Sequence, residues 1–349
     1  RIVAMKRAAA ASQAGRIDEA IDILRALLAR DETNGEANSR LAVLLLKQGD
    51  FSPSTMPIYS RARKSHPASE ALAHALARAC LNAQRRDAEA FAVYREVEET
   101  FEEQGQLQTA LGEILLNRGE AKAALSHLRR ALKRDRPTDE LRRLLARAYL
   151  GCGARSAGAL PYYEFALAEN ENDPALLTAL AETYAAAGKA GEECERICEN
   201  VLAFQPDHRI ARLELGRARL RQGKIDEALR HADLLLEANP ADRDARLLRA
   251  RAIASEGRTD EQAYQALMQA IEDEPDEPAL LAAAAKAALA HGTGGEAADA
   301  LLEQAYAANP RDGELARAAL NRARDAHRLE RVIEAGERLA ELGEAGPAE

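Results

Sequence analysis

A glycine recurs along this chain of 349 residues at an interval of 34 or 35 positions. Gln84 fills the single gap in the series, and a small residue stands seven positions before each member. The series is Gly15, Gly49, Gln84, Gly119, Gly153, Gly188, Gly223, Gly257 and Gly292, and the small residues are Ala8, Ala42, Ala77, Gly112, Ala146, Ala181, Gly216, Ala250 and Ala285. Two registers with one period indicate stacked repeats, each burying its apolar face against its neighbours.

Each unit contains two apolar patterns of helical spacing, one on either side of the glycine. In the seventh unit, acids also follow the glycine at the start of the second pattern, where the helix dipole favours negative charge. The residues are Leu213, Gly216 and Leu220, then Ile225, Ala228, Leu229 and Ala232, with the acids Asp226 and Glu227. Only 4% of the residues are aromatic and none is Trp. Aliphatic and small residues must therefore form the core, which favours closely packed helices.

Together these features resemble the tetratricopeptide repeat, a helix–turn–helix unit of about 34 residues. The shared features are the small residue, the turn glycine, an alanine five positions later, a late alanine in the second helix and a closing proline. The resemblance implies an all-α, right-handed superhelical solenoid forming one domain over residues 1–346, with a frayed tail at 347–349. Its ten units are 1–34, 35–69, 70–104, 105–138, 139–173, 174–208, 209–242, 243–277, 278–312 and 313–346.

Two units depart from the pattern. The third lacks the turn glycine, and the tenth has Leu320 and His327 where a small residue and a glycine belong. Charged side chains crowd the tenth unit, and a terminal repeat has one face without a neighbour. We therefore interpret the tenth unit as a degenerate C-terminal cap.

The overall charge narrows the classes of partner. A net charge of −9 and a pI of about 5.5 disfavour nucleic acid, because neutralising phosphates needs a surplus of cations. No apolar run approaches the roughly 18 residues that a membrane span requires, so we expect no direct membrane insertion. Four cysteines are too few for a disulfide scaffold and favour the reducing cytoplasm. A periplasmic location is the alternative if a signal peptide precedes Arg1.

The sequence contains no recognisable catalytic or metal-binding set, and we expect neither an enzyme nor a cofactor. Cys194 and Cys198 would share one face of a helix, but no complementary Cys or His pair accompanies them. We interpret them as core thiols rather than half of a metal site. The seven histidines are dispersed among the units. The glycine-rich segment 291–295 falls where the repeat register requires a turn, which favours a loop over a phosphate-binding or oxyanion site.

Two further segments have both a structural and a functional interpretation. Pro57 and Pro161 fall at the twenty-third position of their units, which predicts a locally irregular start to the second helix. The segment around Pro57 could otherwise serve for docking or phosphorylation. The acidic run at 272–278 is interpreted as a solvated junction that favours the next helix N-terminus. A landing site for a basic partner is the alternative.

The resemblance also implies where a ligand binds. In this family the first helices of the repeats form the inner wall of a groove, and positions 2, 5, 9, 12 and 13 contact the ligand. The ninth positions here are Ala9, Val43, Arg78, Glu113, Arg147, Glu182, Arg217, Arg251, Lys286 and Asn321. The alternating charges of Glu113, Arg147, Glu182 and Arg217 predict a ladder of ion pairs that contributes little to binding.

Beyond Arg217 the alternation fails, which predicts a cationic strip for an acidic segment of a partner. The strip comprises Arg217, Arg221, Arg251 and Lys286, and Arg147, Arg143 and Arg78 extend the candidate groove. Solvation, or pairing with Asp244 and nearby loop acids, is the structural alternative. The lysine and asparagine clamp with which some family members hold a C-terminal carboxylate is not present in its usual form.

The expected function is a non-catalytic scaffold or adaptor that binds a peptide or partner protein in its groove, within a multi-protein complex. One alternative is a recruiting or regulatory region of a larger enzyme whose catalytic domain lies outside this chain. Another is a periplasmic protein for assembly or polysaccharide export.

Removing the tenth unit tests its role as a cap. Truncation after Pro310 should expose the apolar face of the ninth unit, lowering both solubility and the melting temperature, because each repeat of a solenoid depends on its neighbours. Thermal unfolding monitored by circular dichroism measures the effect. A soluble truncated chain with an unchanged transition would contradict the cap assignment.

Overall fold

The computed structural model describes residues 1–134, 136–290, 296–325 and 329–342. These residues form twenty α-helices and two short 3-10 helices, with no strand among them. The helices are α1 (Ile2–Gln13), α2 (Ile17–Leu28), α3 (Gly35–Gln48), η1 (Pro53–Thr55), α4 (Met56–Ser65), α5 (Glu70–Asn82), α6 (Ala88–Val97), α7 (Gln104–Asn117), α8 (Ala121–Arg134), α9 (Asp139–Gly151), η2 (Ala157–Ala159), α10 (Leu160–Glu169), α11 (Pro174–Ala186), α12 (Glu192–Phe204), α13 (Arg209–Arg221), α14 (Ile225–Ala238), α15 (Arg243–Glu256), α16 (Glu261–Asp273), α17 (Pro278–Ala290), α18 (Glu296–Ala308), α19 (Gly313–Asp325) and α20 (Leu329–Glu341).

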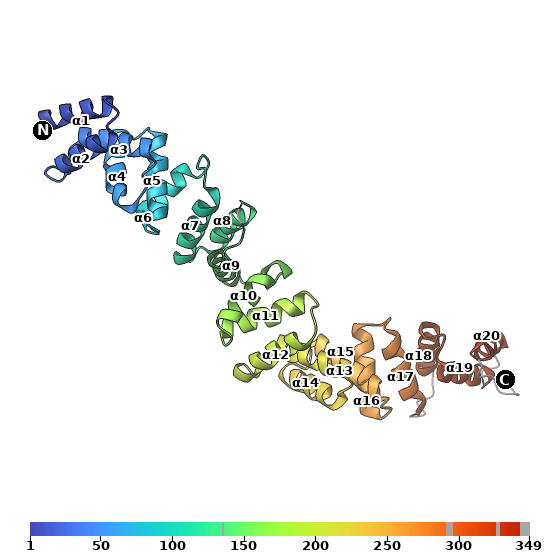
Figure 1. The fold of residues 1–349 in the computed structure, drawn as a ribbon. Coiled ribbons are helices and arrows are strands. Elements are labelled where there is room, and N and C mark those ends of the chain that lie inside the picture. Colours follow the sequence, from blue (N-terminus) through green and yellow to red (C-terminus); the bar gives the residue numbers. More distant parts are fainter. Residues whose placement is uncertain (135, 291–295, 326–328, 343–349) are drawn as a thin grey trace. The chain divides into compact units, whose positions relative to one another are not determined.

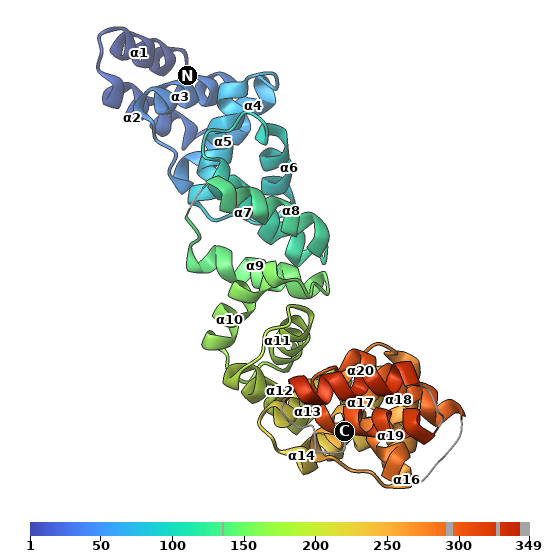
Figure 2. The same ribbon diagram turned by 90° about the vertical axis from the view of Figure 1, so that its right-hand side faces the viewer.

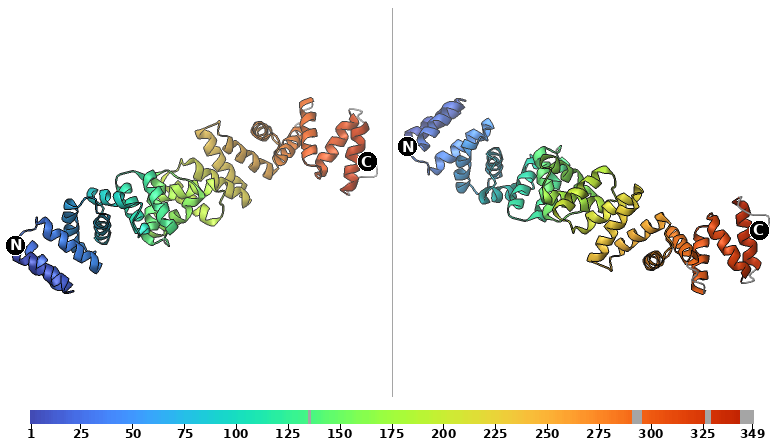
Figure 3. Two further views of the ribbon diagram at one scale, coloured as in Figure 1. Left: turned by 90° about the horizontal axis from the view of Figure 1, so that it is seen from above. Right: turned by 90° about the horizontal axis from the view of Figure 1, so that it is seen from below.

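Consecutive helices pack against one another in pairs, as α1 with α2 and α7 with α8 (Figures 1 and 2). Each predicted unit contains one such pair, and we call its first helix A and its second helix B. The all-α repeat architecture is therefore confirmed. The chain divides into two compact units, Arg1–Glu171 and Asn172–Glu349. Within each of them the helix pairs follow in sequence order, from blue to green and from yellow to red in Figure 3.

The turn between helices A and B has the left-handed backbone that the glycine series predicts. Gly49 ends α3 with φ 69°, and Gly257 ends α15 with φ 73°. The amide of Asp50, just after the glycine, returns to the carbonyl oxygen of Leu45 at 3.0 Å, so the turn satisfies a carbonyl group at the helix end. Gln84 occupies its gap in the series with φ 53°. Gly292 and the segment 291–295 lie outside the described residues.

The small residue before the turn lies where helix A packs closely against neighbouring helices. Ala42 and Ala77 are fully buried. A Cβ atom added at Gly112 of α7 would lie 2.6 Å from the side chain of Leu128 in α8. No larger residue fits at such a crossing without moving its neighbour. The recurrence of small residues is thus a packing requirement of each helix pair.

A buried tyrosine on helix B fixes the turn in three repeats. The hydroxyl group donates to a backbone carbonyl oxygen nine residues earlier, at the residue that follows the left-handed position. The bonds join Tyr59 to Asp50 at 2.7 Å, Tyr94 to Arg85 at 3.1 Å and Tyr163 to Ala154 at 2.9 Å. Burial raises the pKa of Tyr59 and Tyr94 well above the usual value, so the hydroxyl proton remains available for this bond.

The irregular starts predicted near the two prolines are also present. Pro57 and Pro161 are each the second residue of their helix, and η1 and η2 precede them. A proline in the first turn removes no intrahelical hydrogen bond, because that amide would have no helical partner.

The tenth repeat consists of α19 and α20. Ala335 and Leu339 of α20 pack against Ala316 and Leu320 of α19, which explains the leucine in place of a small residue. Ile333 is 60% exposed, so the outer face retains one apolar side chain. His327 and the tail from 343 onward lie outside the described residues. Within the described ranges, the helices lack the length and apolar character needed to cross a bilayer.

Exchanging the residues at two turns tests the left-handed requirement. Gln84→Gly should raise the free energy of unfolding by about 0.5–1 kcal/mol, because a residue with a Cβ is strained at positive φ and glycine is not. The matched variant Gly119→Gln (φ 79°) should lower it by a similar amount. Urea titration measures both. Destabilisation by Gln84→Gly would show that the glutamine side chain matters more than the backbone.

Candidate partner-binding surface

The predicted cationic strip lies on the A helices of the second compact unit, and three of its four cations are already paired. Three of its members form ion pairs with carboxylates near the start of the next helix A. The distances are 3.3 Å from Arg217 to Asp244, 2.8 Å from Arg251 to Glu274 and to Glu277, and 2.9 and 2.7 Å from Lys286 to Asp312 and Glu314. Arg217 also binds Glu214 on its own helix at 2.7 Å. The structure therefore shows the pairing with loop acids that was the alternative to an open strip.

The position of these acids follows from helix capping. Asp312 accepts hydrogen bonds from the backbone amides of Glu314 and Leu315, at 3.0 and 3.2 Å. Acids at such a position satisfy free amides and interact favourably with the helix dipole. Because successive A helices are neighbours, a long cation at the ninth position of one reaches the capped end of the next.

These pairs stabilise both charged forms. The hydrogen bond to Glu277 raises the pKa of Arg251, and the same bond lowers the pKa of Glu277. A ligand carboxylate would have to displace these acids. The acidic run at 272–278 supplies Glu274 and Glu277 to Arg251, and its Asp273 binds Arg246 at 2.7 Å. Three of its carboxylates are thus engaged within the chain.

The remaining predicted cations each have separate surroundings. Arg78 binds Glu102 and Glu103 at 2.7 and 2.9 Å, and Arg143 binds Glu169 at 2.7 Å. Arg147 donates to the side chain of Asn117 at 3.3 Å. Arg221 is exposed and makes no ion pair or side-chain hydrogen bond within the described part of the chain. Within the first compact unit, Arg78, Arg143 and Arg147 thus have separate partners.

The ladder expected from alternating charges is not formed at its start. Glu113 pairs with Arg86, a turn residue of the preceding repeat, and not with Arg147. In the second compact unit, the carboxylate of Glu182 lies 3.5 Å from the ring of His208. The prediction was wrong at Glu113 because a side chain at the ninth position reaches a neighbouring turn or cap as readily as the equivalent position one repeat away.

A groove whose ninth positions, Ala9 and Val43, carry no charge lies between the A helices of the first two repeats. It has a volume of about 360 Å³ and is formed mainly by α1 and α3. Six of its lining residues occupy positions 5, 9, 12 or 13 of their units: Ala9, Ser12, Gln13, Ser39, Val43 and Lys47. Val43 is 49% exposed, although most valines in helical proteins are buried. The available signal in the sequence was the absence of charge at Ala9 and Val43.

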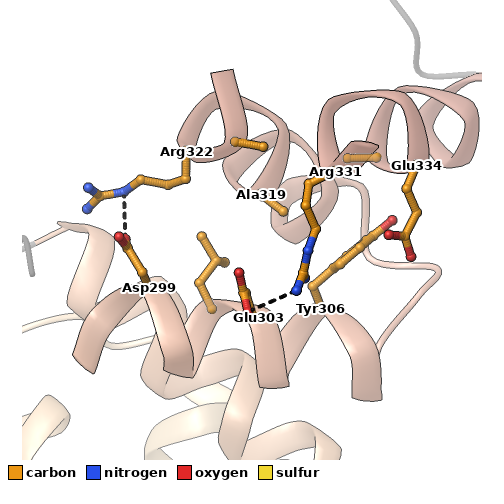
Figure 4. Close-up of a pocket in the computed structure, with 10 residues that line it drawn as sticks. Asp299, Glu303, Tyr306, Ala319, Arg322, Arg331 and Glu334 are labelled. Carbon is orange, nitrogen blue, oxygen red and sulfur yellow. Dashed lines mark ion pairs between the residues drawn. The ribbon is translucent and has the colours of Figure 1, made fainter. Parts of the chain in front are cut away.

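A smaller cleft lies among α18, α19 and α20 at the C-terminal end. Figure 4 shows Arg322 extending toward Asp299 and Arg331 toward Glu303, with Tyr306 beside Arg331. Both ion pairs measure 3.4 Å. The cleft has a volume of about 50 Å³, which admits a few water molecules but no peptide side chain of ordinary size.

Sequence profiles of the tetratricopeptide repeat match residues 11–55 and 213–278. Both segments contain the A–turn–B arrangement described above. These two segments are tetratricopeptide repeats. The fold of the chain is that of a protein-interaction scaffold. No curated protein sequence is significantly similar to it.

Solved structures of tetratricopeptide-repeat proteins resemble this chain at low identity. The repeat domain of P58(IPK) is 17% identical over 97% of this chain and 98% of that domain, with a TM-score of 0.35. YrrB, described as having an unusual peptide-binding site, is 19% identical over 54% of this chain and 95% of its own, with a TM-score of 0.32. TTC0263 from Thermus thermophilus is 24% identical over 53% of this chain and 99% of its own, with a TM-score of 0.29.

Three of the four thiols, those of Cys80, Cys194 and Cys198, are buried. Cys194 and Cys198 are 6% and 0% exposed on α12, and no third potential ligand joins them among the described residues. The hydrogen bond to Cys194, together with burial, raises the pKa of Cys198. Burial raises the pKa of Cys80 to about 11. Cys152, in contrast, is half-buried.

Thiol labelling tests this assignment. In the folded protein, Cys152 should react with a disulfide reagent much faster than the other three cysteines, because only accessible thiolates are nucleophilic. Cys152→Ala should remove the fast phase and Cys194→Ala should not. Fast labelling of Cys194 or Cys198, or stoichiometric zinc that is lost in Cys194→Ala, would contradict the core assignment.

Proposed function

We propose that this chain is a non-catalytic scaffold that binds an extended peptide or partner helix in the groove of its first two repeats. The observation that supports this choice is the exposed Val43 in a groove whose ninth positions carry no charge. At the equivalent position in later repeats, Arg78, Arg217, Arg251 and Lys286 are engaged with acids of this chain. Apolar surface left open in a concave wall is a common feature of binding sites.

The chemistry of the groove favours an apolar ligand side chain beside a polar backbone. Val43 and Ala9 supply contact area, and burying apolar surface contributes about 25 cal/mol per Å². Ser12, Gln13 and Ser39 line the same groove and offer hydrogen-bonding groups. Lys47 and Arg40 add positive charge at one side. An amphipathic segment with an apolar residue every third or fourth position fits this arrangement.

The cationic strip of the later repeats remains a competing proposal for an acidic segment. Binding there would exchange one carboxylate for another, as at Arg251, which already binds two glutamates. Such an exchange gains less than a new contact, because the same bonds exist before binding. We therefore place the principal site in the first two repeats.

The two sites are distinguished by selecting peptides against the wild-type chain from a random library. For a selected peptide, Val43→Glu should raise the Kd more than about tenfold. A charged side chain in place of the apolar contact should weaken binding by at least about 1.4 kcal/mol, which corresponds to a factor of ten in the Kd. The control combines Arg217→Glu with Arg251→Glu and should change the Kd less than about twofold. The reverse pattern, with unchanged helical circular dichroism, would refute the groove and support the strip.

A further inference from the structure

Helix α8 contains five cations and no acid. They are Lys122, Arg129, Arg130, Lys133 and Arg134. On a chain with a net charge of −9, this is a strong local excess of positive charge. This excess was not predicted, because the candidate binding residues were all on A helices and α8 is a helix B. The signal in the sequence was the basic run itself.

Three of these cations line a hollow between α6 and α8. The hollow has a volume of about 720 Å³. Arg130, Lys133 and Arg134 of α8 line it together with Arg95 of α6, and Glu98 and Glu99 contribute from the connection that follows α6. Four cations and two acids leave a surplus of two positive charges.

The deeper acid is already satisfied. The side chain of Glu98 is 11% exposed, and its two oxygens accept from Arg95 at 2.6 Å and Arg130 at 3.0 Å. The amide of Gln108 lies 3.5 Å from the same carboxylate, and the Gln108 carbonyl oxygen accepts from the ring of His127 at 2.7 Å. This network fixes the floor of the hollow and holds the two arginines in place.

The outer cations have no such partner. Lys133 and Arg134 are exposed, and neither makes an ion pair or a side-chain hydrogen bond with another described residue. Both cations lie in the last turn of α8, where positive charge interacts favourably with the helix dipole. That effect explains a cation in the last turn, but it explains neither the hollow beside it nor Arg95 of α6 in the lining of that hollow.

We propose that this hollow binds an acidic segment of a partner protein, with carboxylates held by Lys133 and Arg134. The site is on the B-helix side of the first compact unit. It shares no lining residue with the groove of α1 and α3 and would be a second binding site beside it. Lysine and arginine without internal partners gain new charge-assisted bonds on binding, unlike the paired cations of the A helices. Arg130 keeps donors beyond the one given to Glu98.

A peptide fits this site better than a nucleic acid. The exposed carboxylate of Glu99 lines the same hollow and would repel a continuous phosphate backbone. The one lining aromatic ring, Phe101, is only 3% exposed, so it offers no face on which a base could stack. A few carboxylates spaced along a flexible segment can approach the outer cations and avoid the acids.

The probe is a short fluorescein-labelled peptide of alternating Glu and Ser, with binding followed by fluorescence anisotropy. The double variant Lys133→Glu with Arg134→Glu should raise the Kd more than about tenfold. The matched control is Lys122→Glu, an exposed cation on the same helix outside the hollow, which should raise it less than about twofold. Val43→Glu should leave it unchanged, so this test is independent of the groove.

Several results would overturn the proposal. An unchanged Kd in the double variant would do so, as would an equal loss in Lys122→Glu, which would indicate a diffuse charge effect. A Gln-Ser peptide that binds as tightly would show that carboxylates are not recognised. A single-stranded oligonucleotide that displaces the peptide at a lower concentration than unlabelled peptide would assign the hollow to nucleic acid. Urea unfolding of each variant confirms that the fold is retained.

Discussion

The close packing of helix A against its neighbours at a small residue is the interaction on which the first nine repeats depend. At Gly112 the space for a Cβ atom is already occupied by Leu128, and Ala42 and Ala77 are fully buried. This contact sets the angle of the pair, and the left-handed turn that follows makes the pair possible over so few residues. With few aromatic rings, the chain gains its burial from many such contacts between neighbours.

The backbone of this protein was predictable because it depends on local chemistry. A glycine that needs positive φ, or a small residue at a crossing, is visible in one sequence with a constant period, and even the exception at Gln84 adopts the same backbone. The side-chain pairing was less predictable. Arg251 finds Glu277, 26 residues away, whereas a comparison of equivalent positions considers only partners one full repeat away. Rotamers and helix offsets decide that choice.

The two candidate surfaces differ in how sequence could have revealed them. The groove of α1 and α3 is defined by the lack of charge at Ala9 and Val43, which becomes informative only when the later cations are seen to be paired. The hollow at α8 is defined by Lys133 and Arg134, which form no ion pair with another described residue, beside arginines that Glu98 already holds. Recognising it requires the three-dimensional arrangement of α6, α8 and Glu98. Composition shows the excess of charge, but only the packing shows which charges are available.

The ion pairs between successive A helices also limit how freely repeats can be exchanged. Each joins a cation of one repeat to an acid near the start of the next, as Lys286 joins Asp312. Deleting or duplicating a single repeat within Asn172–Glu349 would place a cation beside a sequence that was not matched to it. The cation at the ninth position of one repeat and the acid at the start of the next therefore have to be kept together when the length of the solenoid is altered.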